Sequence, residues 1–565
     1  MFLRGFVLFR PKRTQKTIFD HDICLPAARI EALEKTWAGP FRRLVLPMID
    51  EESFRPFYCE DNGRPNKPVA ILVGVCILKE MNNLTDLEVL GALDFDLRWQ
   101  YAFNINAFES HVCQKTLHNF RTLITANEQA RNLFTGITDA IIETAALSTE
   151  KQRLDSTQIT SNMAHLSRLG LFTRTIEAFL KRLHKKHPKW YEKLPRLYDK
   201  AYLKRAGYFA DVTSSRAKRR LDKSARHLAE LVDRFRGHPE ISRMKEYRLM
   251  ARLLSEQCRF IEGDPGKTEL KKPKEIPADS LQNPSDPDAT YGRKGKGYKA
   301  SLTETCVKEN PFQVITDVDV APSYANDQKD VMPVIERLEE TGHKPAELFG
   351  DAGYGSGENI LQAHEREVEL TAPVTCGKAP DLNKMQLSDF ETSEGCTQVV
   401  SCIRGHAPLE CKIVERGKVV EAVFSREHCL LCEFLPICPV TRIRGGDYRL
   451  KYKRKDMVSS KRRVQQETHD FKERYKIRSG IEATISEADR VTGFKRSWTR
   501  GKKRVTLSVF MKALAINIKR FVQSRLDQAK KTFSNSLEGD NNDHFPRLCG
   551  LCRYAGNLSC VSMAA

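Results

Sequence analysis

The sequence predicts an α/β protein in which helices flank a mixed sheet, preceded by an all-helical N-terminal domain and interrupted by a helical insertion. The first 145 residues show apolar repeats of helical period. Two alternating segments joined like a hairpin are followed by strand, helix, strand and helix. A long helical stretch separates an earlier strand from that hairpin. At 565 residues the chain is too long for one core, so we expect several domains.

Residues 1–145 predict the helical N-terminal domain. The segment PVAILVGVCILKEM is almost continuously apolar, and the next helix begins with Thr85 as its N-cap and Glu88 three residues later, the pattern of a capping box. A final basic, polar helix, KTLHNFRTLITAN, favours a DNA-docking module of the helix-turn-helix kind. On pattern alone, a small helical bundle without that function fits equally well.

Residues 146–383 predict the first part of a sheet domain. A short strand, KQRLDSTQITSNM, precedes a helical insertion over about 166–279, which ends in a polar, proline-rich connection without periodicity. GYKASLTETC and PFQVITDVDVA then predict a hairpin. A helix over 327–340 follows, and AELFGDAGYGSGENI predicts a strand that ends in a glycine-rich turn.

Residues 384–447 form a cysteine-rich insertion. Residues 448–525 predict the second part of the sheet domain, with one unbroken helix, SSKRRVQQETHDFKERYKIRSGIEATISEADRV, and a later apolar helix. Residues 526–565 are expected to form a polar, irregular tail.

The net charge of +20 and the isoelectric point near 9.2 favour a polyanionic partner, with nucleic acid first. A membrane surface is the alternative, but no basic amphipathic segment has an apolar face rich in Trp or Phe. No apolar run approaches the roughly 18 residues of a membrane span, and the first residues lack a signal-peptide cleavage pattern. We therefore expect a cytoplasmic protein.

Four side chains are predicted to share one face of the helix that follows residue 475: Tyr475, Arg478, Glu482 and Asp489. Gly480 costs about 1 kcal/mol relative to alanine inside a helix, which suggests a close approach by another backbone or a ligand. From the helix alone, a solvated polar face with an incidental glycine is the favoured interpretation.

Two further carboxylates favour a metal site. Asp155 lies within a predicted strand, and Asp351 lies at the carboxyl end of another, where open sheets place ligands. Mg²⁺ prefers carboxylate oxygens, and a pair of ions can stabilise both the attacking and the leaving oxygen of a phosphoryl transfer.

Four segments, RLDSTQITSNM, NPSDPDATYGRKGKGYKASLTETC, LFGDAGYGSGENI and YKIRSGIEATISEADR, resemble the successive blocks of bacterial insertion-sequence DDE transposases with a Tyr, Arg, Glu, Lys signature. The resemblance covers nearly the whole chain and implies a ribonuclease H-like fold. It implies that Asp155, Asp351 and Glu482 are the catalytic acids and hold Mg²⁺ or Mn²⁺, as two ions. It also implies hydrolysis at the element's ends and strand transfer into target DNA by a homodimer.

By the same resemblance, Tyr475 and Arg478 lie against the DNA near the cleaved end. The signature's Lys position is Asp489 in this chain, which places a carboxylate where a cation would contact phosphate; Arg490 is a candidate replacement. The segment FKRSWTRGKKR, residues 494–504 and here called the basic segment, adds further DNA-binding candidates. These are Lys495, Arg496, Trp498, Arg500, Lys502, Lys503 and Arg504.

Cysteines form a candidate zinc site in the cysteine-rich insertion. CLLCEFLPIC supplies Cys429, Cys432 and Cys438, and Cys402 lies upstream with His406 as a substitute. Free, buried thiols are the alternative.

Two other functions are compatible with the sequence. One is a metal-dependent DNA endonuclease without strand transfer. The other is a catalytically inactive, transposase-derived protein that binds DNA but does not cut it.

Overall fold

The computed structural model describes residues 7–12, 20–61, 63–105, 112–203, 213–261, 264–374, 381 and 383–539. The last helix, α19 (Lys502–Gly539), runs well past residue 526. The prediction of an irregular tail from residue 526 is therefore wrong up to Gly539, because the apolar helix continues as a polar one. The rest of that predicted tail, 540–565, lies outside the described residues.

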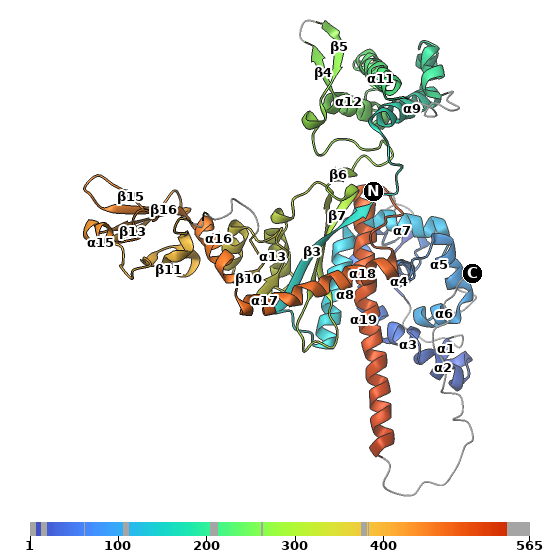
Figure 1. Ribbon diagram of the computed structural model, residues 1–565. Helices are drawn as coiled ribbons and strands as arrows, with labels where there is room; N and C mark the ends of the chain where they lie inside the picture. Colours follow the sequence, from blue (N-terminus) through green and yellow to red (C-terminus); the bar gives the residue numbers. More distant parts are fainter. Residues whose placement is uncertain are drawn as a thin grey trace.

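A mixed sheet forms the centre of the molecule, which confirms the predicted α/β class (Figure 1). Its strand order is β10–β9–β3–β7–β6. β8 pairs with the edge of β7 that does not pair with β3. The strands are β3 (Lys151–Thr160), β6 (Thr290–Gly292), β7 (Gly295–Thr305), β8 (Ile315–Pro322), β9 (Glu347–Phe349) and β10 (Glu369–Thr371). β7 is central and almost entirely buried, whereas β3 alternates between buried and accessible positions.

The pairing directions divide this sheet in two. β7 runs antiparallel to both β3 and β8, while β9 runs parallel to β3 and β10 runs parallel to β9. The parallel strands are connected through α13 (Val331–Glu340) and α14 (Gly357–Glu365), which pack on the sheet by apolar faces. The carboxyl end of β9 therefore opens beside the middle of the much longer β3.

The N-terminal helices share one core with the sheet and with α19, which lies between them (Figure 1). α4 is buried along most of its length, as its continuous apolar sequence predicts. The capping box at the start of α5 is confirmed, since the Thr85 hydroxyl accepts from the Glu88 amide and the Glu88 carboxylate accepts from the Thr85 amide. The longer helices are α2 (Ala27–Glu34), α4 (Val69–Met81), α5 (Asp86–Phe95), α6 (Leu97–Phe103), α7 (Gln114–Ala126) and α8 (Gln129–Ala145).

The helical insertion forms a separate lobe with its own apolar core. It contains α9 (Arg168–Lys186), α10 (Pro188–Glu192), α11 (Ser214–Phe235) and α12 (Lys245–Gln257). The polar connection predicted after α12 contains β5 (Asp264–Leu270), which pairs antiparallel with β4 (Cys258–Ile261) just before it. The sequence did not predict this hairpin because β5 lacks alternating apolar residues. Backbone hydrogen bonds pair the two strands whatever their side chains are.

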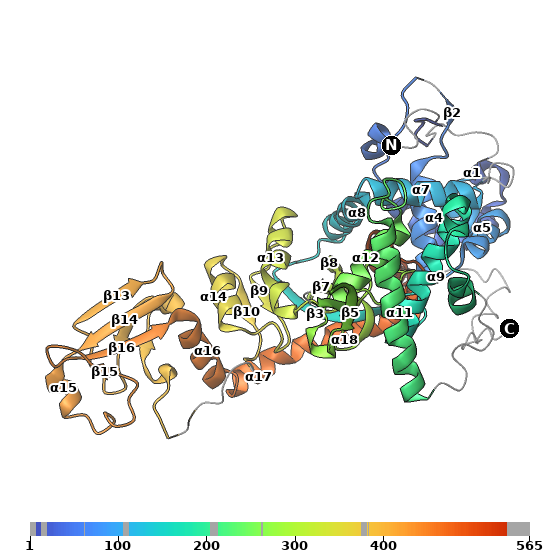
Figure 2. The ribbon, with the colours of Figure 1, turned by 90° about the horizontal axis from the view of Figure 1, so that it is seen from above.

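The cysteine-rich insertion folds at the opposite end of the molecule from the N-terminal helices (Figure 2). Four of its strands pair in the order β13–β14–β16–β15 and cover a small core, so the insertion extends to Lys453 and the predicted boundary at residue 447 is wrong. Its elements are β11 (Glu391–Thr392), β12 (Val399–Ser401), β13 (Glu410–Val414), β14 (Val419–Phe424), α15 (Arg426–Leu430), β15 (Thr441–Arg442) and β16 (Tyr448–Lys453).

The predicted unbroken helix before residue 492 is wrong. It is divided into α16 (Arg454–Gln465), α17 (His469–Tyr475), a 3₁₀ turn (Lys476–Ser479) and α18 (Gly480–Thr492). Thr468 starts α17 as an N-cap whose side chain accepts from the Phe471 amide. Gly480 therefore begins a helix rather than interrupting one. In the part of the chain that the structure describes, no helix combines the length and the apolar character needed to cross a bilayer.

Candidate active site

Asp155 lies in β3, and Asp351 lies two residues beyond the end of the neighbouring strand β9, at the same level. The parallel ladder pairs Arg153 of β3 with Phe349 of β9, and each aspartate follows its paired residue by two positions. Side chains two residues apart on a strand share a face, and neighbouring strands are about 4.8 Å apart. The Gly350 amide still bonds to the Thr371 carbonyl at 3.2 Å, so sheet pairing continues as far as Gly350, and Asp351 begins a turn in which its carboxylate accepts from the Gly353 amide at 2.8 Å. Asp351 is close enough to Asp155 to raise the pKa of that carboxyl.

Arg478 connects the third acid to the first. One terminal nitrogen of its guanidinium donates to Asp155 Oδ2 at 2.7 Å, and the other donates to Glu482 Oε1 at 2.8 Å. The Asp155 side chain is 13% exposed and that of Arg478 is 17%, whereas Glu482 is 63% exposed. The 3₁₀ turn brings Arg478 over the strand, and the first turn of α18 carries Glu482 beside it.

Burial controls the ionisation of Asp155. Desolvation raises the pKa of this carboxyl above its ordinary value, the nearby Asp351 adds to that rise, and the Arg478 charge and the Ser156 amide oppose it. Burial likewise raises the pKa of Tyr475, whose ring stacks on Phe471 with centroids 5.7 Å apart. A positive charge close to Asp155 is therefore needed to keep this buried acid ionised.

Arg153 explains the glycine at position 480. A Cβ at this position would overlap the Arg153 guanidinium, which donates to the Ile477 carbonyl at 2.9 Å and also pairs with the buried Glu304. The close approach expected at Gly480 is thus made by a strand side chain rather than by another backbone.

Pattern reasoning missed a second polar group beside the acids. Ser156 donates to Asp327 at 3.0 Å, and the nearly buried Lys299 donates to both Asp327 and Asp330 at 2.9 and 2.7 Å. Asp327 follows β8 in sequence. It contacts β3 through Ser156, the residue next to Asp155. The available signal was an acid shortly after a predicted strand, the same signal that selected Asp351.

The three acids do not form a closed ligand set as they stand. Within the described ranges, no three His, Cys, Asp or Glu side chains are grouped so that they could hold a metal ion. The Arg478 guanidinium lies between Asp155 and Glu482, and its Nε is buried without a hydrogen-bond partner. Arg478 thus occupies the space in which an ion shared by these two carboxylates would lie.

The basic segment is attached to the far end of the same strand. The Thr160 amide donates to the Lys495 carbonyl at 2.8 Å, the Ser497 amide donates to the Thr160 carbonyl at 3.0 Å, and Asn162 donates to the Trp498 carbonyl at 3.0 Å. The side chain of Trp498 is 65% exposed. The charged members of the predicted DNA-binding set in and before this segment are also exposed: Arg490, Lys495, Arg496, Arg500, Lys502, Lys503 and Arg504.

Asp489 holds the chain turn that leads into the basic segment. Its Oδ1 accepts a hydrogen bond from the Lys495 amide at 2.9 Å, and its carbonyl accepts from the Gly493 amide at 2.8 Å, where α18 ends in a left-handed glycine. The carboxylate at the signature's Lys position therefore has a local partner in this chain.

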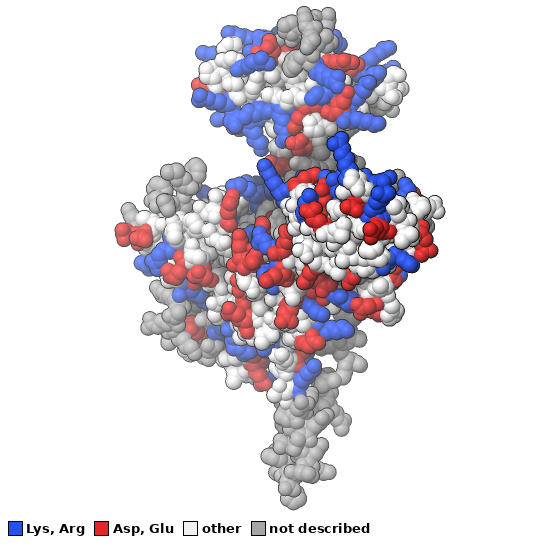
Figure 3. Space-filling view, turned by 90° about the vertical axis from the view of Figure 1, so that its left-hand side faces the viewer, with Lys and Arg blue, Asp and Glu red and all other residues white. Residues whose placement is uncertain are grey.

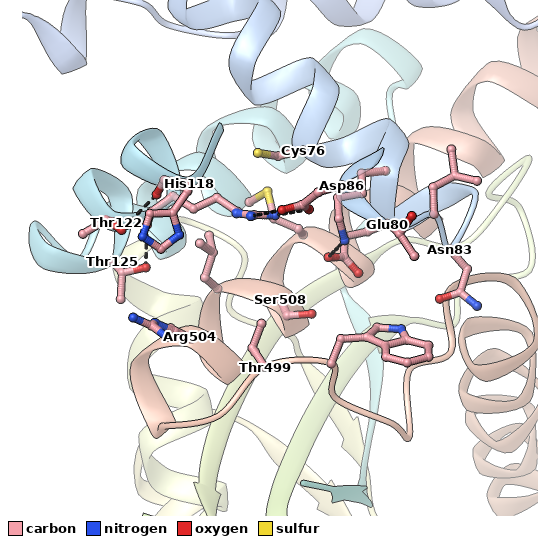
Figure 4. A pocket seen from close by; sticks show the side chains of 17 residues that line it. Cys76, Glu80, Asn83, Asp86, His118, Thr122, Thr125, Thr499, Arg504 and Ser508 are labelled. Carbon is pink, nitrogen blue, oxygen red and sulfur yellow. Dashed lines mark hydrogen bonds and ion pairs between the residues drawn. The ribbon is translucent and has the colours of Figure 1, made fainter. Parts of the chain in front are cut away.

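A cavity of about 320 Å³ lies behind Trp498, between the N-terminal helices and the start of α19 (Figure 4). Asp86 and Arg121 form an ion pair in its wall, and His118 and Thr122 project from α7 on one side. Arg504 and Thr499 lie on the side formed by the basic segment.

The four cysteines of the candidate zinc site line one small cavity of about 30 Å³, together with His406 and His428. All four are free thiols. Burial raises the pKa of Cys429 to about 11, and the three neighbouring thiols add to the rise. The two imidazole rings stack with centroids 4.1 Å apart.

Two family models match the chain. Residues 31–123 match the Transposase domain (DUF772), and residues 401–522 match the Transposase DDE domain. The second match contains Glu482 and the basic segment but neither Asp155 nor Asp351. No curated protein and no solved structure matches the chain. Both matches are to transposase domains, and together they cover less than half of the chain.

Proposed function

We propose that this chain is a DDE transposase that cleaves DNA at the ends of an insertion sequence and transfers the freed strand into a target. The observation that supports it best is the matched level of Asp155 in β3 and Asp351 just beyond the adjacent parallel strand β9, with Arg478 linking Asp155 to Glu482. The three acids come from distant parts of the chain; Asp155 and Glu482 share the Arg478 guanidinium, and the charge of Asp351 acts on it electrostatically.

The sheet supports a ribonuclease H-like fold. That fold carries its acids on the first strand, the fourth strand and a following helix. Apart from the short β6, the first strand of the central sheet here is β3 and the fourth is β9, and α18 follows both. The helical insertion lies between β3 and β7, the first and second strands in this count.

The donor chemistry of the three acids fits Mg²⁺ or Mn²⁺, which prefer carboxylate oxygens. Such ions, as a pair, would stabilise the attacking and leaving oxygens of phosphodiester cleavage. Arg478 neutralises Asp155 and orients Glu482, so these acids would hold such a cation only if the guanidinium gave up its contact with one of them. The freed N–H groups could then bind a DNA phosphate, since a planar guanidinium binds phosphate, like carboxylate, in a bidentate manner.

The basic segment supports DNA as the partner because its cations and Trp498 are exposed beside the far end of β3. Holding two element ends together requires two copies of the chain, so the active form is proposed to be a homodimer on DNA. The clustered thiols of the cysteine-rich insertion have the donor types of a structural zinc site, and a bound cation would reverse the raised pKa of Cys429 and Cys438.

The decisive experiment supplies the purified full chain with DNA that carries the sequences flanking its gene, a target plasmid, and Mg²⁺ or Mn²⁺. Cleavage at one flank followed by joining of its 3′-hydroxyl end to the plasmid is expected from the wild type. Asp351→Asn should abolish both steps while DNA binding persists. Matched inverted repeats in the flanking DNA would add independent support.

The two alternatives give different results in the same assay. An endonuclease cuts the DNA, but a 3′-hydroxyl oligonucleotide is never joined to the plasmid. An inactive DNA-binding descendant shows no cleavage with either ion, and Asp351→Ala leaves every measurable activity unchanged.

A further inference from the structure

A groove of about 830 Å³ lies where the helical insertion meets the basic segment and the end of α7. Of the twelve described residues that line it, six are Lys or Arg and one is an acid, Asp288. The cations come from both sides of the groove: Lys245, Arg248 and Arg252 from α12, and Arg500, Lys503 and Arg504 from the basic segment.

Most of this positive charge is not neutralised. Within the described chain, the side chains of Lys245, Arg248, Arg500 and Arg504 have no carboxylate partner, and Lys503 reaches only the exposed Glu128 at 3.3 Å. Both Lys245 and Arg248 are exposed to solvent. Cations that converge on one groove without counter-charges favour an anionic ligand with several charges.

The groove is built on fixed supports. The fully buried Asp286 accepts hydrogen bonds from the Gly501 amide at 3.0 Å and the Tyr298 hydroxyl at 2.7 Å, and Asp288 accepts from the Lys502 amide at 2.9 Å. Asp288, the one acid among the described lining residues, is therefore bonded to the backbone of the basic segment. On the other wall, Arg252 pairs with Glu256 at 2.6 Å and donates to the Pro287 carbonyl at 2.9 Å. The insertion and the basic segment are thus joined through residues 286–288.

The groove is aligned with the candidate active site. The basic segment bonds to Thr160, five residues beyond Asp155 on β3. At about 3.3 Å per residue this is roughly 16 Å along the strand. The lobe above the groove also carries many Lys and Arg side chains on the face shown in Figure 3.

We propose that α12 and the basic segment together bind the phosphate backbone of a DNA duplex, so that the helical insertion is one wall of the substrate channel. Lys245 and Arg248 are the new phosphate-binding residues. This inference rests on the proposed function, because it names the path of the same DNA that reaches the three acids.

The test compares the full-length wild type with the double variant Lys245→Gln, Arg248→Gln. The matched control is Arg182→Gln, Lys185→Gln, which removes the same charge from exposed positions of α9 in the same lobe but outside the groove. Affinity for a mixed-sequence DNA duplex is measured by fluorescence anisotropy over a series of salt concentrations. Thermal unfolding checks that each variant folds, and the single variant Lys245→Glu repeats the test with a smaller structural change.

Loss of two phosphate contacts is expected to lower the slope of log affinity against log salt by about 1.8, and the control should keep the wild-type slope. An unchanged slope and affinity in the folded groove variant, or an equal loss in the control, would overturn the proposal that this groove binds DNA. The transposase proposal would remain intact. A wild type that binds no duplex at any salt concentration would instead overturn the proposed function itself.

Discussion

The Arg153 guanidinium occupies the space that a side chain at Gly480 would require. Arg153 extends from β3 across the first turn of α18, donates to the Ile477 carbonyl at 2.9 Å, and pairs with the buried Glu304. Because Asp155 lies two residues further along the same strand and Glu482 two residues further along the same helix, this contact sets the separation of two proposed catalytic acids.

Gly480→Ala should therefore impair the chain despite alanine's better helix propensity. The methyl group must displace a guanidinium that is bonded on both sides, so the free energy of unfolding should fall by about 1–3 kcal/mol. Displacement of α18 should also lower the cleavage rate by on the order of 10- to 100-fold. Urea unfolding and the plasmid cleavage assay measure the two effects.

Gly136→Ala is the matched control, because nothing lies near a Cβ at that exposed position of α8, and it should stabilise the chain by about 0.5–1 kcal/mol. In an Arg153→Ala background the cost of Gly480→Ala should shrink. Equal costs in both backgrounds would show that the arginine is not the obstacle.

Arg478→Gln should shift the acidic limb of the cleavage profile to higher pH. The pKa of Asp155 is already raised by burial, and the Arg478 charge holds it down, so removing that charge raises it further. The acid must be ionised to bind a cation, so activity is lost as pH falls through this raised pKa, above the ordinary aspartate value of about 3.9. Initial cleavage rates across a pH series at saturating Mg²⁺ give the shift.

Arg490→Gln serves as the control for that profile, since Arg490 is exposed at the end of α18 and has no part in the shift at Asp155. It should leave the acidic limb in place. An Arg478→Gln enzyme with a lower rate but the wild-type limb would show that Arg478 does not act through the ionisation of Asp155.

Restoring the signature's cation with Asp489→Lys should not improve DNA binding. The substitution removes the acceptor for the Lys495 amide and places a third positive charge beside Lys495 and Arg490. The free energy of unfolding should fall by about 0.5–1.5 kcal/mol, whereas Asp489→Asn keeps a carbonyl acceptor and should lose less. A Lys variant that is as stable as the wild type and binds DNA tenfold more tightly would mark Asp489 as a defect at a phosphate contact.

Sequence patterns predict those parts of the molecule whose causes are local. The Thr85 capping box and the burial of α4 follow from neighbouring residues, and the structure confirms both. The 3₁₀ turn between α17 and α18 could not be predicted. The Ile477 carbonyl in this turn accepts a hydrogen bond from Arg153, which is more than three hundred residues away in the sequence. The groove cations on α12 were missed for the same reason, since a charged helix face shows no partner until the fold places another cationic surface opposite it.

Zinc removal should unfold the cysteine-rich insertion selectively. If the four thiols close around one tetrahedral ion, as proposed, the purified chain should contain about one zinc ion, and Cys429→Ser or Cys432→Ser should release it. Cys411→Ser is the control, because Cys411 lies on β13 and does not line the thiol cavity. Metal content is measured by elemental analysis, and chelation should expose this insertion to protease while the central sheet stays protected. A chain that contains no zinc after expression in zinc-supplemented medium, and that resists protease with or without chelator, would leave these cysteines as free core thiols.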